Sequence, residues 1–422
     1  MHLAKLNFFE VRSFVIRKIS RQAAAIVALV LSSCLVSTME CRAVTTFRTL
    51  YTFTSGNDGG RPYVGMIFDR AGNLYGTAYQ GGTSNVGVVF ELAPNGHGGW
   101  SESVLHSFSG EDGSMPDGVL VFDTLGNLYG TTLLGGAYGD GTVFELSPNG
   151  DGTWTESILH SFNGADGFAP EAGVILDQAG DLYGTASGGG THNGGVAFKL
   201  SHGTWTETVL HSFDKNGTDG YQLSATLVLD KHGNLYGTTV WGGNLNNCTG
   251  AGCGIVFRLS PKTNGTWKET ILHSFSGNDG AVPTAPLIFD KGGNLYGTTQ
   301  EGGNRFGTVF ELSPNSDGSW TESVLLLFGG MIGAYPQPAV VFDQMGNLYG
   351  TTTGDGGDRN GTVFELSPNG NGTWTPTVLH SFSNRPGSLA LGGLIVDKHR
   401  KLYGTTAGND RKTFGSAFQI IP

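Results

Sequence analysis

The tripeptide Leu-Tyr-Gly occurs seven times in this chain at nearly constant spacing. The intervals between copies are 54, 54, 53, 60, 53 and 54 residues. A period of this length indicates that each repeat is one supersecondary unit, which cannot bury its apolar face alone and must stack on further copies. The repeats are centred on Leu74, Leu128, Leu182, Leu235, Leu295, Leu348 and Leu402.

Each repeat contains four short runs rich in β-branched and aromatic residues. In the second repeat these runs span 118–123, 127–132, 141–146 and 153–162. They are separated by Gly, Asn and Asp residues, which hairpin turns need for positive φ. Together with 70 glycines and 45 aromatic residues among 422, this pattern predicts an all-β protein made of β-meanders.

The two ends of the repeat region complement each other. Residues 46–53 resemble a fourth strand without the first three, whereas residues 415–420 form a third strand without a fourth. A ring closed by the N-terminal strand leaves no unprotected sheet edge, and an open solenoid would gain nothing from this offset. We therefore predict a seven-bladed β-propeller over residues 44–422, with four antiparallel strands per blade and the last blade closed by the N-terminal strand. A parallel β-helix is the alternative.

Residues 1–43 are predicted to be an export signal peptide. A basic stretch precedes a short apolar run from Ala23 to Leu31, and Cys41-Arg42-Ala43 offers a cleavage site. The run is too short for a permanent membrane helix, so no transmembrane segment is expected in the mature chain. The expected location is secreted, periplasmic or at the cell surface. The alternative is a lipoprotein anchored at Cys34, because Leu31-Ser32-Ser33-Cys34 is similar to a lipobox.

The mature chain is acidic. Residues 1–43 hold six of the 24 Lys/Arg and two of the 35 Asp/Glu, so the mature chain keeps 18 and 33, a formal charge of −15. Nucleic-acid binding needs a concentrated basic face, so no nucleic-acid partner is expected. Only Cys248 and Cys253 remain after processing, and we predict a disulfide between them. We expect a monomer without metal or cofactor.

The motifs GNLYGTT, GTVFELSPNG and TWTESILHSF carry a resemblance to a known family. With them the chain resembles the choice-of-anchor tandem repeat GloVer-containing proteins, a bacterial exported family, over about residues 46–420. The resemblance implies repeats of this length and export, and it assigns no catalytic residue. The order of Pro, Gly, Asp and Leu-Tyr motifs is also weakly similar to NHL propellers, and the Gly-Gly pairs to kelch repeats.

Three residue types that recur at fixed repeat positions are interpreted as structural. The tryptophans that open the fourth strand are expected to pack between blades: Trp100, Trp154, Trp205, Trp267, Trp320 and Trp374. The aspartates that end the first strand are expected to stabilise hairpins: Asp69, Asp123, Asp177, Asp230, Asp290, Asp343 and Asp397. The histidines of the Leu-His-Ser-Phe motif are expected to fill apolar space, because Leu326 and Tyr51 occupy the same position: His106, His160, His211, His273 and His380.

The loops that differ between repeats are predicted to carry function, on the face with the longer connections. The fourth repeat has the longest interval, the Cys pair and the only Trp outside the fourth-strand position. The predicted ligand-binding residues, suited to sugars or peptides, are Trp241, Tyr221, Tyr79, Tyr138, Arg305 and Arg359. The alternative role for Trp241 is to cover the disulfide loop.

We expect a binding module for a carbohydrate, a peptide or a cell-envelope component. No nucleophile elbow, zinc-protease helix or phosphate loop occurs in the sequence, and no catalytic residue is assigned. The alternative is a polysaccharide lyase or glycoside hydrolase in which carboxylates converge at the central channel. Its candidate carboxylates are Asp112, Glu171, Asp219, Asp279 and Glu301.

Overall fold

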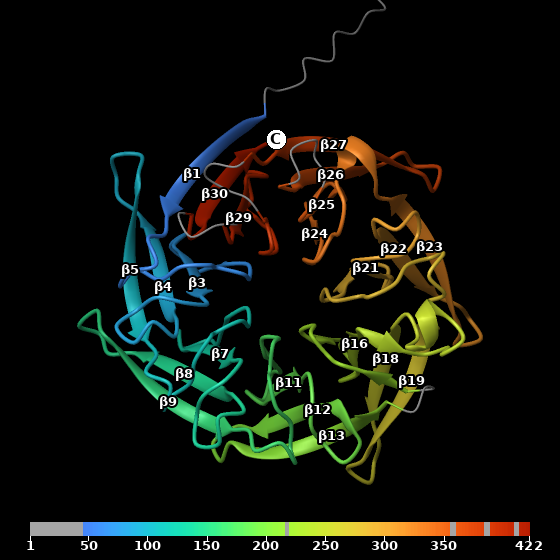
Figure 1. The fold of residues 1–422 in the computed structure, drawn as a ribbon, viewed down its shortest axis with the longest axis horizontal. Helices are drawn as coiled ribbons and strands as arrows, with labels where there is room; N and C mark the ends of the chain where they lie inside the picture. The colour runs from blue at the N-terminus through green and yellow to red at the C-terminus, as the bar shows by residue number, and fades with distance from the viewer. Residues whose placement is uncertain (1–44, 216–218, 355–359, 384–388, 409–412) are drawn as a thin grey trace, which may run out of the picture. The chain divides into compact units, whose positions relative to one another are not determined.

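Every Leu-Tyr-Gly tripeptide begins the second strand of a four-stranded antiparallel sheet. The computed structural model describes residues 45–215, 219–354, 360–383, 389–408 and 413–422, and these residues form seven such sheets. Figure 1 shows the sheets arranged as blades around a common axis. The prediction of an all-β, seven-bladed propeller is confirmed.

Each blade runs from a short inner strand to a long outer strand. The first strands are β2 (Ile67–Phe68), β6 (Val121–Phe122), β10 (Ile175–Leu176), β15 (Val228–Leu229), β20 (Ile288–Phe289), β24 (Val341–Phe342) and β28 (Ile395–Val396). The second strands are β3 (Leu74–Ala78), β7 (Leu128–Thr132), β11 (Leu182–Ala186), β16 (Leu235–Thr239), β21 (Leu295–Thr299), β25 (Leu348–Thr351) and β29 (Leu402–Thr406). The third strands are β4 (Val88–Pro94), β8 (Thr142–Pro148), β12 (Asn193–Ser201), β18 (Ile255–Pro261), β22 (Thr308–Pro314), β26 (Thr362–Pro368) and β30 (Ser416–Ile421). The fourth strands are β5 (Trp100–Ser107), β9 (Trp154–Ser161), β13 (Thr206–Asp214), β19 (Trp267–Ser274), β23 (Trp320–Leu327), β27 (Trp374–Ser381) and β1 (Thr46–Thr52).

The Leu-Tyr-Gly motif is explained by packing inside each blade. The second strand is buried along its whole length. A Cβ atom on Gly130 would lie 2.6 Å from the ring of Phe144, which is fully buried on the neighbouring third strand. Only glycine lets the backbone approach that ring so closely, so the glycine is a packing requirement.

The N-terminal strand closes the ring, as predicted. Strand β1 pairs with β30 in the sheet β1-β30-β29-β28, with Phe47 opposite Ile420 and Thr52 opposite Ser416. Figure 1 shows β1 beside β30. The Phe47 ring also packs on Phe418, with ring centres 5.6 Å apart. The outer edge of blade seven is thereby completed by a segment from the opposite end of the chain.

A ring of buried threonines joins successive blades near the axis. The Thr131 hydroxyl donates a hydrogen bond to the Ala172 carbonyl oxygen at 2.9 Å, and four further second-strand threonines repeat this bond to the next blade. The Thr405 hydroxyl donates to the Val64 carbonyl oxygen at 2.8 Å and so joins blade seven to blade one. In the described residues, the equivalent Thr77 hydroxyl is buried without a hydrogen-bond partner.

The recurrent Trp and Asp residues have the structural roles predicted for them. Trp154 on blade two packs against Tyr75 of blade one, with ring centres 6.4 Å apart, and five other blade junctions have the same Trp–Tyr contact. Asp123 Oδ1 accepts hydrogen bonds from the backbone N–H groups of Leu125 and Asn127. The other six aspartates accept the same pair of bonds, as hairpin-stabilising side chains do.

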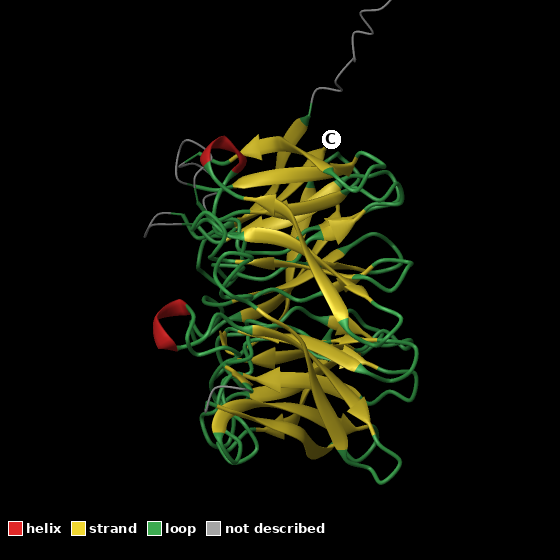
Figure 2. Ribbon diagram, turned by 90° about the vertical axis from the view of Figure 1, so that its right-hand side faces the viewer, coloured by secondary structure: helices red, strands yellow, loops and turns green. Residues whose placement is uncertain are grey.

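The two faces of the propeller differ in their connections. Short turns such as 69–73 and 94–99 lie on one face, which we call the turn face; the longer connections and the segments before each first strand lie on the other, the loop face. Figure 2 shows two 3₁₀ helices, η1 (Cys248–Gly250) and η2 (Gly330–Ile332), on the loop face. Cys248 and Cys253 form the predicted disulfide there. Among the described residues, no helix has the length and apolar character to cross a membrane.

Candidate functional site

Two of the predicted ligand-binding residues, Trp241 and Tyr221, lie side by side on blade four. Strand β14 (Gly220–Tyr221) pairs with β17 (Trp241–Gly242), and Tyr221 is directly opposite Trp241. The Lys215 ammonium lies 5.8 Å from the centre of the Tyr221 ring, within cation–π range. Trp241 is partly buried and packs against the core cluster that contains Cys253. This environment supports the alternative interpretation, in which Trp241 covers the disulfide loop.

Two other predicted residues, Tyr138 and Arg305, lie on the loops of other blades. Tyr138 is 66% exposed on the loop of blade two, and Arg305 lies on the loop of blade five with φ of 82°. In the described part of the chain, no hydrogen bond, ion pair or ring contact joins either residue to Trp241. Arg359 lies outside the described residues.

Tyr79 belongs to a different cluster, at the inner end of blade one on the loop face. Its ring packs edge-to-face on Tyr63, with ring centres 4.9 Å apart. The Tyr79 backbone N–H donates to the Arg61 carbonyl oxygen at 3.2 Å, and Arg61 Nη1 donates to the Tyr63 hydroxyl at 3.2 Å. All three residues are partly exposed, and Arg61 Nε is buried without a hydrogen-bond partner among the described residues.

Two carboxyl groups from the next two blades face this aromatic pair. Burial, and secondly the charge of Glu171, raise the pKa of Asp117 to about 7. The pKa of Tyr79 is also raised, first by burial and then by the charges of Asp117, Tyr63 and Glu171. These mutual effects place the groups within electrostatic range of one another. We call Arg61, Tyr63, Tyr79, Asp117 and Glu171 the axis-end cluster.

The axis-end cluster occupies positions where the repeats have the same backbone conformation but different side chains. Residues 61, 115, 169, 222, 282, 335 and 389 all have φ between 53° and 62°. Two positions further on, the seven repeats carry Tyr63, Asp117, Glu171, Ser224, Thr284, Gln337 and Leu391. The sequence analysis singled out Tyr79 and Glu171 but missed Tyr63 and Asp117. Tyr63 and Asp117 could have been found by comparing the seven repeats position by position in the segment before each first strand.

A second repeated cluster lies at the outer rim, between the fourth strands of adjacent blades. His106, at the end of β5, has its Nε2 atom 3.0 Å from Oδ2 of Asp112 in the loop that follows. The same pairing recurs at 3.1 or 3.2 Å in His160–Asp166, His211–Asp219 and His273–Asp279. Each of these histidines also packs edge-on against the Phe two residues later. The prediction of apolar, space-filling histidines was therefore incomplete, because each ring is also held by a carboxylate.

A glutamate from the next blade completes each rim cluster. Burial, the first cause in every copy, raises the pKa of Glu102, Glu156, Glu207, Glu269 and Glu322 to about 7. In all five, Oε1 is buried without a hydrogen-bond partner among the described residues. In the first copy Tyr51 replaces the histidine, and its hydroxyl donates to Asp58 Oδ2 at 3.0 Å. We call each His/Tyr–Asp–Glu set a rim clasp.

Two blade junctions lack the rim clasp. Between blades five and six the corresponding residues are Leu326, Ile332 and Pro376, all apolar. Between blades six and seven, His380 is kept but meets Phe47 in place of a glutamate, and the two rings stack with centres 4.0 Å apart. The whole set is therefore apolar at one junction, and only part of it is replaced at the other.

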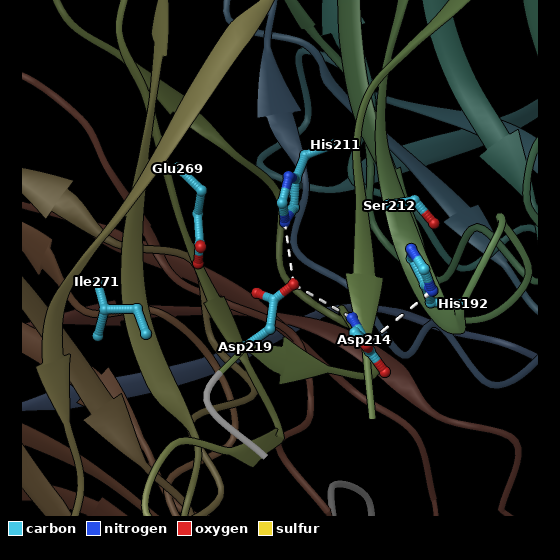
Figure 3. Close-up of a pocket in the computed structure, with 7 residues that line it drawn as sticks. All are labelled: His192, His211, Ser212, Asp214, Asp219, Glu269 and Ile271. Atoms are coloured by element: carbon cyan, nitrogen blue, oxygen red, sulfur yellow. Dashed lines mark hydrogen bonds and ion pairs between the residues drawn. The ribbon is translucent and has the colours of Figure 1, made fainter. Parts of the chain in front are cut away.

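The clasp between blades three and four opens into a cavity of about 460 Å³. His211, Ser212 and Asp214 enter it from β13, Glu269 and Ile271 from β19 of the next blade, and His192 from the loop before β12. Figure 3 shows Asp219 between His211 and Glu269, with His192 on the far side of Asp214. His192 Nδ1 lies 4.0 Å from Asp214 Oδ2.

Three of the carboxylates that were expected at the central channel lie elsewhere. Asp112, Asp219 and Asp279 lie at the outer rim, where each is paired with a histidine. Their expected convergence at the axis is therefore wrong. Glu171 does lie at the axis end, where its partner is Asp117.

The comparisons with known proteins agree with the fold. The sequence profile described as the Gloeobacter/Verrucomicrobia repeat matches residues 33–251 and 249–422. None of the curated proteins compared with the chain matches its sequence.

Solved structures with similar folds include three enzymes. A fungal alcohol oxidase in complex with copper has a TM-score of 0.57 at 13% identity, covering 90% of this chain and 76% of its own. A luciferin-regenerating enzyme has a TM-score of 0.45 at 14% identity, covering 73% of this chain and 91% of its own. A gluconolactonase from Xanthomonas campestris has a TM-score of 0.42 at 14% identity, covering 74% and 87%. At these identities the oxidase shows a shared fold alone, and the two lower scores carry no argument.

Proposed function

The chain belongs to the Gloeobacter/Verrucomicrobia repeat family, and we propose that this member is an exported binding module whose axis-end cluster takes a carbohydrate. The observation that carries the proposal is the edge-to-face pair of Tyr63 and Tyr79 beside Asp117 and Glu171. Sugars present apolar C–H faces, which pack on aromatic rings, and hydroxyl groups, which donate to carboxylates. The cluster supplies both kinds of partner.

The position of the cluster supports binding at this place. A constant backbone presents a different side chain from each blade, and the charged members, Arg61, Asp117 and Glu171, are on blades one to three. Rigid scaffolds with variable loop positions are a common arrangement for ligand recognition. We therefore place the main ligand contacts at Tyr79 and its neighbours, with Trp241 in a structural role.

Isothermal titration of the mature chain with soluble cello-, xylo- and malto-oligosaccharides tests the proposal. For the sugar that binds, Tyr79→Ala should weaken affinity at least tenfold, which corresponds to about 1.4 kcal/mol. Tyr335→Ala is the matched control, because Tyr335 on blade six occupies the repeat position that Arg61 occupies on blade one. Equal losses in the two variants, or no binding by any of the sugars, would contradict the proposal.

Export is the second part of the proposal. The basic and apolar pattern of residues 1–43 is typical of a signal peptide, and disulfides such as Cys248–Cys253 persist in oxidising compartments. We expect a monomer that starts at Val44. Mass spectrometry of the protein recovered from a bacterial host would find this N-terminus, whereas a lipid-modified Cys34 would support the lipoprotein alternative.

A specific observation also favours an enzymatic alternative at the same place. A carboxyl group with a pKa of about 7, such as Asp117, can be protonated near neutral pH and donate a proton to a glycosidic oxygen while Glu171 acts as the carboxylate partner. Product release from the oligosaccharides, abolished by Asp117→Asn, would favour the enzyme. Binding without cleavage would favour the module.

A further inference from the structure

We propose that the rim clasp of His211, Asp219 and Glu269 is a binding site for a divalent transition-metal cation, with Zn²⁺ as the best match. One ligand atom from each of the three residues lies within 4.8 Å of the other two. The ligands come from two adjacent blades, because His211 lies on β13 and Asp219 follows it, whereas Glu269 is on β19. A cation held here would bridge the junction between blades three and four.

The chemistry of the three groups favours a cation of this class. One imidazole and two carboxylates form a mixed nitrogen and oxygen set, which suits Zn²⁺ and similar ions, whereas Ca²⁺ and Mg²⁺ prefer oxygen alone. Two carboxylates and a neutral imidazole carry a charge of −2, which a divalent cation balances.

The geometry is close to that of a metal site. His211 Nε2 and Asp219 Oδ2 are 3.1 Å apart, and two ligands bound at about 2.0–2.2 Å from one metal ion lie roughly 3.0–3.5 Å from each other. Glu269 Oε1 is buried and lacks a hydrogen-bond partner among the described residues, so its position is compatible with a further ligand. Metal binding at His211 Nε2 requires loss of any proton there, as for other imidazole ligands.

This copy of the clasp differs from the others by the groups around it. His192 and Asp214 also line the cavity, and they add an imidazole and a carboxylate to the same opening (Figure 3). Residues His106–Asp112–Glu156 and His273–Asp279–Glu322 form equivalent three-residue sets. We therefore expect the strongest binding at His211 and weaker binding at these two.

One blade junction has lost the whole set. At the junction of blades five and six all three members are apolar, as Leu326, Ile332 and Pro376, as expected where residues that share one ligand are no longer needed. Single members change elsewhere: Tyr51 replaces the histidine in one clasp, and Phe47 replaces the glutamate beside His380. A shared proton would produce the same pattern, so the experiment must separate a proton from a cation.

The test uses the mature chain, treated with EDTA and then dialysed, and titrated with ZnCl₂ in a calorimeter near neutral pH. Glu269→Gln should weaken the tightest binding event at least tenfold. Glu322→Gln is the matched control, since it makes the same change in the clasp of His273 and should leave the tightest event unchanged. Crystals soaked in ZnCl₂ should show an anomalous scattering peak between His211, Asp219 and Glu269.

Three results would overturn the proposal. The first is the absence of both binding heat and an anomalous peak, which would leave a shared proton as the role of the clasp. The second is equal loss in Glu269→Gln and Glu322→Gln. The third is a peak at another place only. Should Glu269→Gln fail to fold, the anomalous peak in the unaltered protein decides alone.

Discussion

The clasp of Tyr51, Asp58 and Glu102, between blades seven and one, predicts that this protein loses stability as the pH rises through neutrality. Glu102 faces Asp58, which already accepts hydrogen bonds from the Tyr51 hydroxyl and from the Thr54 and Gly56 backbone N–H groups. Burial, and secondly the charge of Asp58, raise the pKa of Glu102 to about 7 from an ordinary value of 4.5. A folded-state pKa above the unfolded one means that folding favours the protonated form.

The sign and size of the effect follow from this pKa shift. Below about pH 4.5 Glu102 is protonated in both the folded and the unfolded state, so it does not lower the free energy of unfolding. Between about pH 4.5 and 7 Glu102 ionises in the unfolded state first, so the free energy of unfolding falls as the pH rises. The full shift corresponds to about 3 kcal/mol. Because Glu102 is only partly buried, we discount this for solvent screening to about 1 kcal/mol.

Thermal unfolding of the unaltered chain and of Glu102→Gln, in EDTA at about pH 5 and pH 8, measures the effect. The neutral amide should leave stability nearly unchanged at pH 5 and raise it by about 1 kcal/mol at pH 8, a shift of roughly 1–2 °C for a domain of this size. Glu111→Gln, on the exposed loop beside Asp112, is the control. A Glu102→Gln protein that is less stable than the unaltered chain at pH 8 would refute the reasoning.

Much of the fold could be predicted because the Leu-Tyr-Gly motif and its flanking segments recur seven times in the sequence. The offset between residues 46–53 and 415–420 predicted the pairing of β1 with β30. The last blade lacks its fourth strand, and the extra strand at the N-terminus can supply it only if the ring closes. The hairpin role of residues such as Asp123 followed from contacts within five residues of sequence. Local chemistry and repetition together were sufficient for these features.

The candidate site was harder to predict because its contacts cross from blade to blade. His106 meets Asp112 six residues away, but Glu156 approaches them only after two fourth strands are packed side by side. Asp117 and Glu171 are 54 residues apart in the chain and become neighbours around the axis. A repeat position considered by itself identifies single residues, because the partner of each residue lies in the next repeat.

Three further predictions concern stability. Phe47→Ala removes the ring that stacks on His380 and should lower the free energy of unfolding by about 2–3 kcal/mol, less than for a fully buried Phe because Phe47 is partly exposed; a urea titration measures the loss, and unchanged stability would contradict the role of β1 in closure. Arg400→Leu leaves the buried Asp343 carboxylate without its 3.0 Å partner Nε and should cost about 1–3 kcal/mol in thermal unfolding, whereas a stabilised variant would show that the pair is dispensable. Reduction of the disulfide, or the double replacement of Cys248 and Cys253 by Ser, should cost about 2 kcal/mol for so short a loop, and protease cleavage near 244–252 should increase; an unaltered cleavage pattern would contradict this.

The seven copies also distinguish three kinds of position by how they vary. Positions such as Asp123 and Gly130 are the same in every repeat, because each blade needs the same hairpin and the same close approach to a phenylalanine. The rim-clasp positions vary in part, because the whole set is apolar at one junction, as Leu326, Ile332 and Pro376, whereas single members change at others. The axis-end positions vary singly on one constant backbone, as expected where different blades contact different parts of one asymmetric ligand. Function is therefore to be sought first at the axis end, where Tyr63, Tyr79 and Asp117 have no equivalents on the opposite blades.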